Sequence, residues 1–202
     1  MEELIKRNIV EALNNHGVIA FPTETVMGLG VYFDDKIAFE KLNKVKGRPE
    51  NKPYTLMLAK KENIRDFAYL NDRDIAIIDR FMPGPITLLL RAKSGLPKWV
   101  DLNTGIIGIR VPDYSQTLDI LKAAQKPLLV PSANKSGEKP ANTFKEVQYI
   151  FDKEIDYVVE ADAGLQKPST IVDLTGKDIK IIREGPITLD DIIDSLGGTL
   201  WE

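Results

Sequence analysis

The stretch Lys44-Val-Lys-Gly-Arg-Pro-Glu-Asn-Lys-Pro53 brings four cations, two prolines and one glycine together in ten residues. Apolar residues at helical spacing precede it, so the sequence predicts a helix over residues 35–45 that ends at Gly47 and is followed by a loop. Pro49 and Pro53 restrict the backbone of this loop, and we expect this restriction to fix the direction of its cationic side chains. We interpret the stretch as a site for a polyphosphate. The alternative is a solvated helix end whose cations are favoured by the helix dipole.

The composition is that of a globular protein. The chain has 202 residues, of which 43% are hydrophobic, with 27 Lys and Arg against 30 Asp and Glu. This predicts one α/β domain over residues 1–202, with two small domains as the less favoured alternative. No apolar run is long enough to span a bilayer, and the charged N-terminus lacks a signal-peptide core, so we expect a cytoplasmic protein with no membrane partner. The absence of cysteine excludes thiolate chemistry, and the single His16 argues against a zinc site or a Ser-His triad.

Outward from this stretch, helical patterns alternate with short apolar runs. Helices are predicted over residues 4–13, 64–69, 75–82, 113–124 and 188–196, and a further helix is predicted to begin at Thr143. Capping boxes are predicted at Asp113 with Gln116 and at Thr143 with Glu146. Strands are predicted over residues 18–21, 54–59, 86–90, 106–112, 127–130, 157–160, 169–174 and 179–183. Residues 21–30 carry hydroxyls, a carboxylate and glycines, which is typical of a polar turn facing a ligand.

Four polar groups interrupt or follow the apolar runs. They are residues 23–25, residues 46–52, Arg110 with residues 132–134, and residues 169–170 with Arg183. Open α/β sheets bind their ligands at the ends of strands, so these groups are candidates for one site. For residues 131–137 an Asx-rich loop without a ligand is the alternative.

Seven ordered motifs carry a resemblance to a known family. They are Phe-Pro-Thr-Glu-Thr-Val-x-Gly-Leu-Gly at 21–30, Lys-Gly-Arg-Pro-x-x-Lys-Pro at 46–53, Pro-Gly-Pro-x-Thr at 83–87, Arg-Val-Pro at 110–112, Pro-Ser-Ala-Asn-x-Ser-Gly at 131–137, Ser-Thr-x-Val-Asp at 169–173 and Arg-x-Gly at 183–185. Together they resemble the YrdC-like family, the threonylcarbamoyl-AMP synthases, and the order of seven is far more specific than any one motif. Two residues depart from the family pattern: Met27 replaces the usual tyrosine, and Pro168 replaces a common acidic residue.

The resemblance implies an open, twisted mixed sheet with flanking helices and a concave, positively lined cavity. It also implies synthesis of threonylcarbamoyl-AMP from L-threonine, bicarbonate and ATP with release of pyrophosphate, assisted by Mg²⁺. Downstream threonylcarbamoyl transferase proteins and tRNA would be its partners. Because the carbamate of threonine is itself the nucleophile, catalysis needs positioning and charge neutralisation, and neither a catalytic side chain nor a protein metal site is expected.

Carried over by motif, the resemblance assigns nine site residues. Those expected to bind ATP are Lys46, Arg48, Lys52, Ser132, Asn134 and Arg183, and those expected to bind threonine are Thr23, Arg110 and Ser169. Arg110 would be a bidentate partner for the amino-acid carboxylate, and Met27 would line the amino-acid pocket.

Two other functions compete with this interpretation. The first is an RNA-binding module for double-stranded RNA or tRNA, against which the net charge of -3 and the lack of an aromatic RNA-binding signature argue. The second is a relative that handles a carbamoyl-adenylate, as the same domain does inside hydrogenase-maturation proteins, which are much longer chains.

Overall fold

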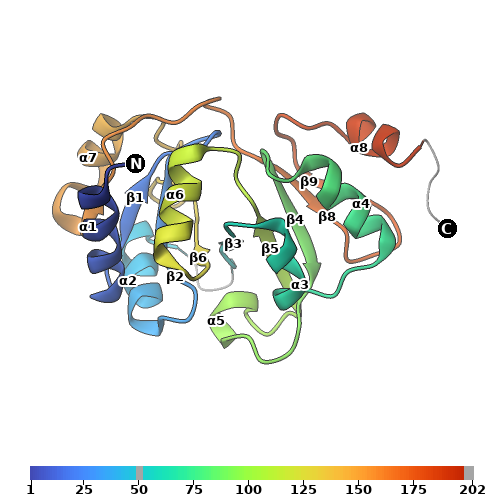
Figure 1. The fold of residues 1–202 in the computed structure, drawn as a ribbon, viewed down its shortest axis with the longest axis horizontal. Coiled ribbons are helices and arrows are strands. Elements are labelled where there is room, and N and C mark those ends of the chain that lie inside the picture. The colour runs from blue at the N-terminus through green and yellow to red at the C-terminus, as the bar shows by residue number, and fades with distance from the viewer. Residues whose placement is uncertain (49–51, 198–202) are drawn as a thin grey trace.

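A single mixed sheet organises the molecule, as seen in a computed structural model that describes residues 1–48 and 52–197. Within these residues nine strands pair in the order β7-β1-β2-β6-β3-β5-β4-β8-β9 (Figure 1). Their bounds are β1 Ile19–Phe21, β2 Gly28–Tyr32, β3 Thr55–Met57, β4 Ile86–Arg91, β5 Ile106–Arg110, β6 Leu128–Leu129, β7 Tyr157–Val158, β8 Thr170–Asp173 and β9 Lys180–Arg183. The pairs β1–β7, β3–β5 and β4–β8 are parallel and the others antiparallel, which confirms the predicted open mixed sheet.

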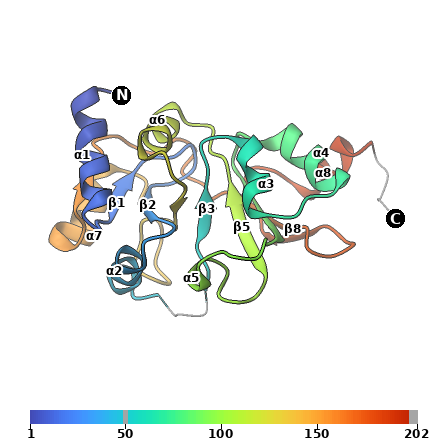
Figure 2. The ribbon, with the colours of Figure 1, turned by 60° about the horizontal axis from the view of Figure 1, so that its bottom comes forward.

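Helices cover both faces of this sheet. They are α1 Glu3–Asn14, α2 Lys36–Lys46, α3 Ile64–Phe67, α4 Asp72–Phe81, α5 Lys98–Asp101, α6 Ser115–Ala124, α7 Phe144–Phe151 and α8 Leu189–Ser195, with 3-10 turns at Lys61–Asn63 and Asp152–Glu154. Side chains of α1 and α6 belong to one hydrophobic core and those of α2, α3, α4, α5, α7 and α8 to the other. Figure 2 shows α6 near the upper ends of the central strands and α2 and α5 near their lower ends. None of the helices in the described part of the chain has the length and hydrophobicity needed to cross a membrane.

In β1 and β3, successive side chains pack into two separate cores. Ala20 and Leu56 belong to the larger core, which includes side chains of α2, α4 and α7, whereas their neighbours Phe21 and Met57 belong to the smaller core with α1 and α6. This follows from the period of two in a β-strand, and it explains why the strands appear in the sequence as continuous apolar runs.

Two helix ends match the sequence prediction. Gly47 adopts the left-handed conformation (φ 58°) at the end of α2, where a residue without a Cβ has no steric penalty. At the start of α7, Thr143 and Glu146 form the predicted reciprocal capping box, with the Glu146 N–H donating to Thr143 Oγ1 at 3.2 Å.

Two local predictions are wrong, and one helix was missed. Residues 28–32 form the buried strand β2 and not a turn, because Gly28 and Gly30 let neighbouring side chains approach: a Cβ on Gly30 would lie 2.6 Å from the Phe21 ring. The capping box at Asp113 is absent, since the Asp113 N–H donates to Glu24 and α6 begins after Tyr114. Helix α5, which is one turn long, was not predicted.

Candidate active site

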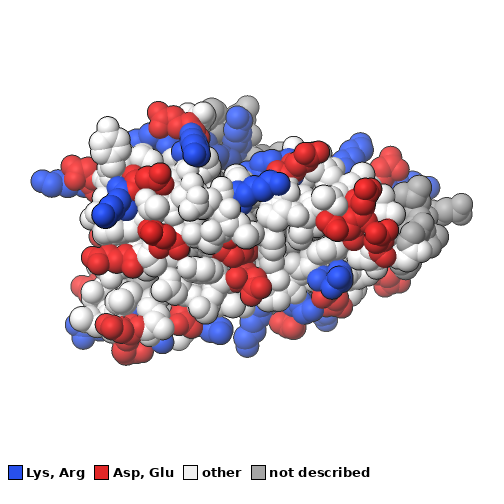
Figure 3. Space-filling model, turned by 90° about the horizontal axis from the view of Figure 1, so that it is seen from above, with Lys and Arg blue, Asp and Glu red and all other residues white. Residues whose placement is uncertain are grey.

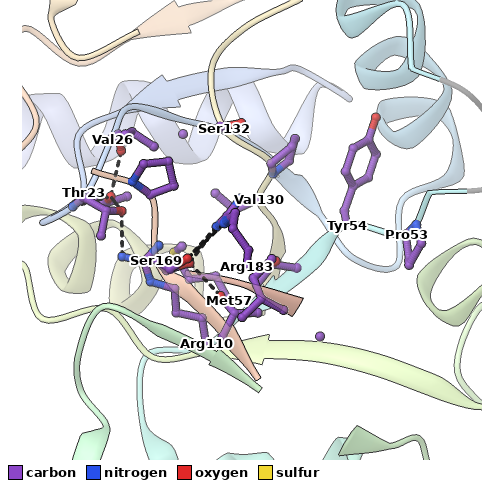
Figure 4. Close-up of a pocket in the computed structure, with 18 of the residues that line it drawn as sticks. Thr23, Val26, Pro53, Tyr54, Met57, Arg110, Val130, Ser132, Ser169 and Arg183 are labelled. Carbon is purple, nitrogen blue, oxygen red and sulfur yellow. Dashed lines mark hydrogen bonds between the residues drawn. The ribbon is translucent and has the colours of Figure 1, made fainter. Parts of the chain in front are cut away.

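The four polar groups predicted from the sequence meet in one cavity of about 190 Å³. Its lining comes from the β1–β2 loop, β3, the end of β5, the segment after β6, the start of β8 and the end of β9. Among the described residues that line it are three arginines and no acidic side chain. Figure 4 shows Arg110, Ser169 and Arg183 gathered at one end and Tyr54 at the other. The cavity is smaller than a typical site for a whole cofactor (roughly 300–1,000 Å³), so a nucleotide would extend beyond it.

Six of the nine predicted site residues line this cavity. They are Thr23, Arg48, Arg110, Ser132, Ser169 and Arg183. The other three, Lys46, Lys52 and Asn134, lie beside it, and Met27 and Pro168 also contribute to its wall. Met27 is fully buried. Pro49, which was predicted to stiffen the cationic loop, lies outside the described residues.

Two threonine hydroxyls, those of Thr23 and Thr25, lie close together in the lining of the cavity; the sequence analysis predicts that Thr23 contacts the amino acid, which stays a prediction. Thr23 Oγ1 donates to the Val26 carbonyl at 2.7 Å and lies 2.9 Å from Thr25 Oγ1, and the Thr25 N–H donates back to Thr23 at 3.1 Å. These local bonds replace the strand ladder between β1 and β2 and turn both hydroxyls inward. Thr25, which the sequence analysis did not assign to the site, therefore belongs to it.

Arg110 reaches the cavity already paired with a carboxylate. Its Nη2 lies 2.7 Å from Glu24 Oε1 and donates to Thr25 Oγ1 at 2.9 Å, and both charged side chains are buried. Glu24 Oε1 also accepts the Asp113 N–H, whereas Glu24 Oε2 and Arg110 Nε are buried without a hydrogen-bond partner among the described residues. Glu24 was missed, although a carboxylate between two inward hydroxyls in the first motif could have indicated a buried partner for a cation.

Arg183 and Ser169 form a second fixed pair. Arg183 Nε and Nη2 donate to the Ser169 carbonyl at 3.1 and 2.9 Å, and Nη2 also donates to Ser169 Oγ at 3.1 Å. Thr87, from the Pro-Gly-Pro-x-Thr motif, lies 3.0 Å from the same hydroxyl and was not assigned to the site. Burial lowers the pKa of Arg183, and the nearby charge of Arg110 lowers it further. The guanidinium is thus poorly solvated and lacks an acidic partner in the cavity lining, as expected of a group that awaits an anion.

Lys46 holds the segment after β6 and does not line the cavity. Its Nζ donates to the carbonyls of Ser132 and Asn134 at 2.6 and 2.8 Å and to Asn134 Oδ1 at 3.2 Å, and the residue is only 1% exposed. These acceptors match the three donors of an ammonium group. A direct contact between Lys46 and a phosphate, which stays a prediction, would therefore require exchange of one of these bonds.

The surroundings of Lys46 predict an unusual pH dependence of stability. Burial, together with the charges of Arg48 and Lys135, lowers the pKa of Lys46 to about 7. Because the unfolded chain keeps the proton up to the ordinary lysine pKa, the free energy of unfolding should rise with pH between about 7 and 10, by about 1.4 kcal/mol per pH unit at most. Urea denaturation at several pH values would measure the slope. A parent protein with no steeper slope than a Lys46→Met variant would contradict the prediction.

Arg48, the arginine of the cationic stretch, is held by backbone carbonyls at the other end of that stretch. Arg48 Nε donates to the Lys52 carbonyl at 3.0 Å and Nη2 to the Pro53 carbonyl at 2.9 Å, and its guanidinium lies 4.6 Å from the centre of the Tyr54 ring. Burial lowers the pKa of Arg48. Arg48 thus faces the cavity in a fixed orientation, whereas Lys52 contributes a backbone carbonyl to this arrangement and its side chain is exposed.

Residues 1–48 and 52–197 contain no group of three or more His, Cys, Asp or Glu side chains that could hold a metal ion. The charge that such an ion would bring to a phosphate can, in this cavity, come from three arginine side chains. The arrangement can therefore bind a ligand with several negative groups and orient it between hydroxyls.

A family model described as Sua5/YciO/YrdC, telomere recombination, matches residues 11–185 of this chain. A threonylcarbamoyl-AMP synthase of Klebsiella pneumoniae subsp. pneumoniae is 34% identical over 180 residues, which cover 87% of this chain and 93% of that protein.

Two solved structures share the fold. Sua5 of P. abyssi complexed with L-threonine has a TM-score of 0.92 and 28% identity, and the match covers 98% of this chain but only 58% of that one. E. coli YciO has a TM-score of 0.87 and 25% identity, over 95% of this chain and 94% of that one.

Proposed function

The chain belongs to the Sua5/YciO/YrdC family, and we propose that it synthesises threonylcarbamoyl-AMP from L-threonine, bicarbonate and ATP with release of pyrophosphate. The observation that carries this proposal is the convergence of six motif residues from distant segments on one cavity with three arginines. The threonylcarbamoyl-AMP synthase at 34% identity and the threonine complex of a Sua5 with the same fold support it.

The amino-acid end of the proposed site is formed by Thr23, Arg110 and Ser169. Arg110 presents a guanidinium that Glu24 and Thr25 orient, and such a group suits a carboxylate. The inward hydroxyl of Thr23 suits the hydroxyl and amine of threonine. In the proposed reaction the threonine amine condenses with bicarbonate to a carbamate, releasing water, and the carbamate is held facing the nucleotide.

The nucleotide end is formed by Arg48, Ser132 and Arg183, with Lys46, Lys52 and Asn134 supporting or joining them. A carbamate oxygen attacks the α-phosphorus, the bond to the bridging oxygen of the β-phosphate breaks, and pyrophosphate leaves with both electrons of that bond. Arg48 and Arg183 neutralise the growing charge on the pyrophosphate, and hydrogen bonds already made within the protein hold both cations in place. Mg²⁺ enters as part of the ATP substrate.

The product is a mixed anhydride that reacts readily with amines and water. We place its use with downstream threonylcarbamoyl transferase proteins that modify tRNA, in the cytoplasm. An RNA-binding module is the less favoured alternative, because acidic and basic side chains alternate around a mainly uncharged centre on the face shown in Figure 3. Non-specific RNA binding would favour a continuous basic surface.

Pyrophosphate release without RNA tests the proposed function. Purified protein should release pyrophosphate from ATP and magnesium only when threonine and bicarbonate are both present, and mass spectrometry should detect the adenylate. Serine and valine in place of threonine would measure the selectivity of the amino-acid end. Release that depends on added RNA, or that proceeds equally without threonine, would overturn the proposal.

A further inference from the structure

Tyr54 joins the cationic loop to the centre of the sheet. It directly precedes β3, which pairs with β5 and β6 in the middle of the sheet order. The residue is only 2% exposed, and its hydroxyl donates to Asn43 Oδ1 on α2 at 2.6 Å. The Tyr54 ring is therefore fixed in place. Arg48, in contrast, follows Gly47 at the end of α2 and belongs to the loop.

Arg48 is held on this surface from two directions. The Tyr54 ring supports the face of the guanidinium at 4.6 Å, and the carbonyls of Lys52 and Pro53 accept from two of its donors. A guanidinium has five N–H donors, so a group held in this way can still present an edge to a ligand. Tyr54 also makes an edge-to-face contact with Phe39 at 5.8 Å, and Trp99 stacks on Phe39 at 6.2 Å.

From this geometry we infer that Tyr54 is a positioning residue for ATP: its ring fixes Arg48 at the cavity before the nucleotide arrives. A mobile arginine loses rotamer freedom when it binds a phosphate, whereas a stacked one has already lost it. The inference rests on the proposed function, because it takes Arg48 to bind the triphosphate. Tyr54 was not assigned to the site from the sequence, although it follows the cationic stretch directly.

Replacement of the ring should weaken ATP binding and leave threonine binding unchanged. We expect Tyr54→Leu to weaken ATP binding in calorimetry by about two- to thirtyfold, the range for a partly buried cation–π contact. Tyr54→Phe keeps the ring and loses only the bond to Asn43, so it should bind ATP like the parent. Tyr69→Leu is the matched control, because Tyr69 has Lys93 over its ring at 5.9 Å and does not line the cavity.

A fluorinated series tests the same contact without changing the shape of the core. Phenylalanines with one, two and three fluorine atoms at position 54 progressively weaken the negative face of the ring. ATP affinity should fall stepwise along this series, with unchanged melting temperature and threonine affinity. Since all these rings fill the same space, the test stands even if Tyr54→Leu does not fold.

Three outcomes would overturn the inference. ATP affinity that is constant along the fluorinated series would show that the ring does not fix Arg48, and affinity that rises would show that the stack competes with ATP. Arg48→Lys should lose as much ATP affinity alone as in combination with trifluorophenylalanine at position 54, if the two residues act together. Additive losses of affinity in the double variant would contradict the inference. A parent that binds no ATP would overturn the proposed function as well; a parent that binds ATP but is insensitive to position 54 overturns this inference alone.

Discussion

Glu24→Ala is expected to lower the free energy of unfolding by about 3–5 kcal/mol, because it leaves a buried Arg110 without its partner. The two side chains are 11% and 7% exposed and their charged atoms lie 2.7 Å apart. The substitution also removes the acceptor of the Asp113 N–H at the approach to α6. For a domain of this size the loss corresponds to a fall in Tm of roughly 6–20 °C. Chemical denaturation measures the first quantity and calorimetry the second.

A second buried ion pair in the same chain serves as a control that separates an effect on stability from an effect on threonine binding. Arg73 and Asp74 are 8% and 6% exposed, and neither lines the cavity. Asp74→Ala should also destabilise the fold, since it removes both this partner and the capping box at Asn71. Its folded fraction should bind threonine like the parent, whereas the folded fraction of Glu24→Gln should bind it more weakly. If Glu24→Ala lowers the free energy of unfolding by less than about 1 kcal/mol, then Arg110 is not held in place by its ion pair with Glu24.

The sequence predicts the sheet and the meeting of the polar groups because both depend on patterns within short segments. The central strands are rich in apolar residues, Gly47 ends α2, and Thr143 caps α7, each by a rule that involves a few neighbouring residues. The position of a polar group at the end of an apolar run is likewise local, and this placed Arg110 and Ser132 at one site.

The missed features depend on contacts between distant segments. Glu24 and Arg110 are 86 positions apart, and only the folded sheet makes one the partner of the other. The strand β2 was missed because its glycines were interpreted as conformational freedom, whereas they accommodate Phe21 and Val130. The contacts of Lys46 show the same limit: a contact with a phosphate stays a prediction from its motif, whereas its hydrogen bonds to residues 132–134 could not be predicted from the sequence.

Arg183→Ala is expected to lower kcat/KM for ATP by about 10- to 150-fold, the equivalent of losing charge-assisted hydrogen bonds of about 1.5–3 kcal/mol. The side chain lines the cavity and has a lowered pKa, because burial leaves it poorly solvated. Its removal also releases the Ser169 hydroxyl, so the KM for threonine should rise by a smaller factor. Arg183→Lys keeps the charge but loses the two-donor grip on the Ser169 carbonyl, and an intermediate rate is expected.

Arg91 provides the matched control for this prediction. Its Nε and Nη2 donate to the Thr175 carbonyl at 3.1 and 3.0 Å, almost the same grip that Arg183 has on Ser169, but it lies outside the cavity lining. Arg91→Ala therefore removes the same hydrogen bonds from a strand of the same sheet without changing the charge at the proposed nucleotide end. Steady-state pyrophosphate release by the two variants decides the role of Arg183: equal rates would reduce it to a structural clamp on Ser169, whereas a selective loss in Arg183→Ala would identify the cation that neutralises the leaving pyrophosphate.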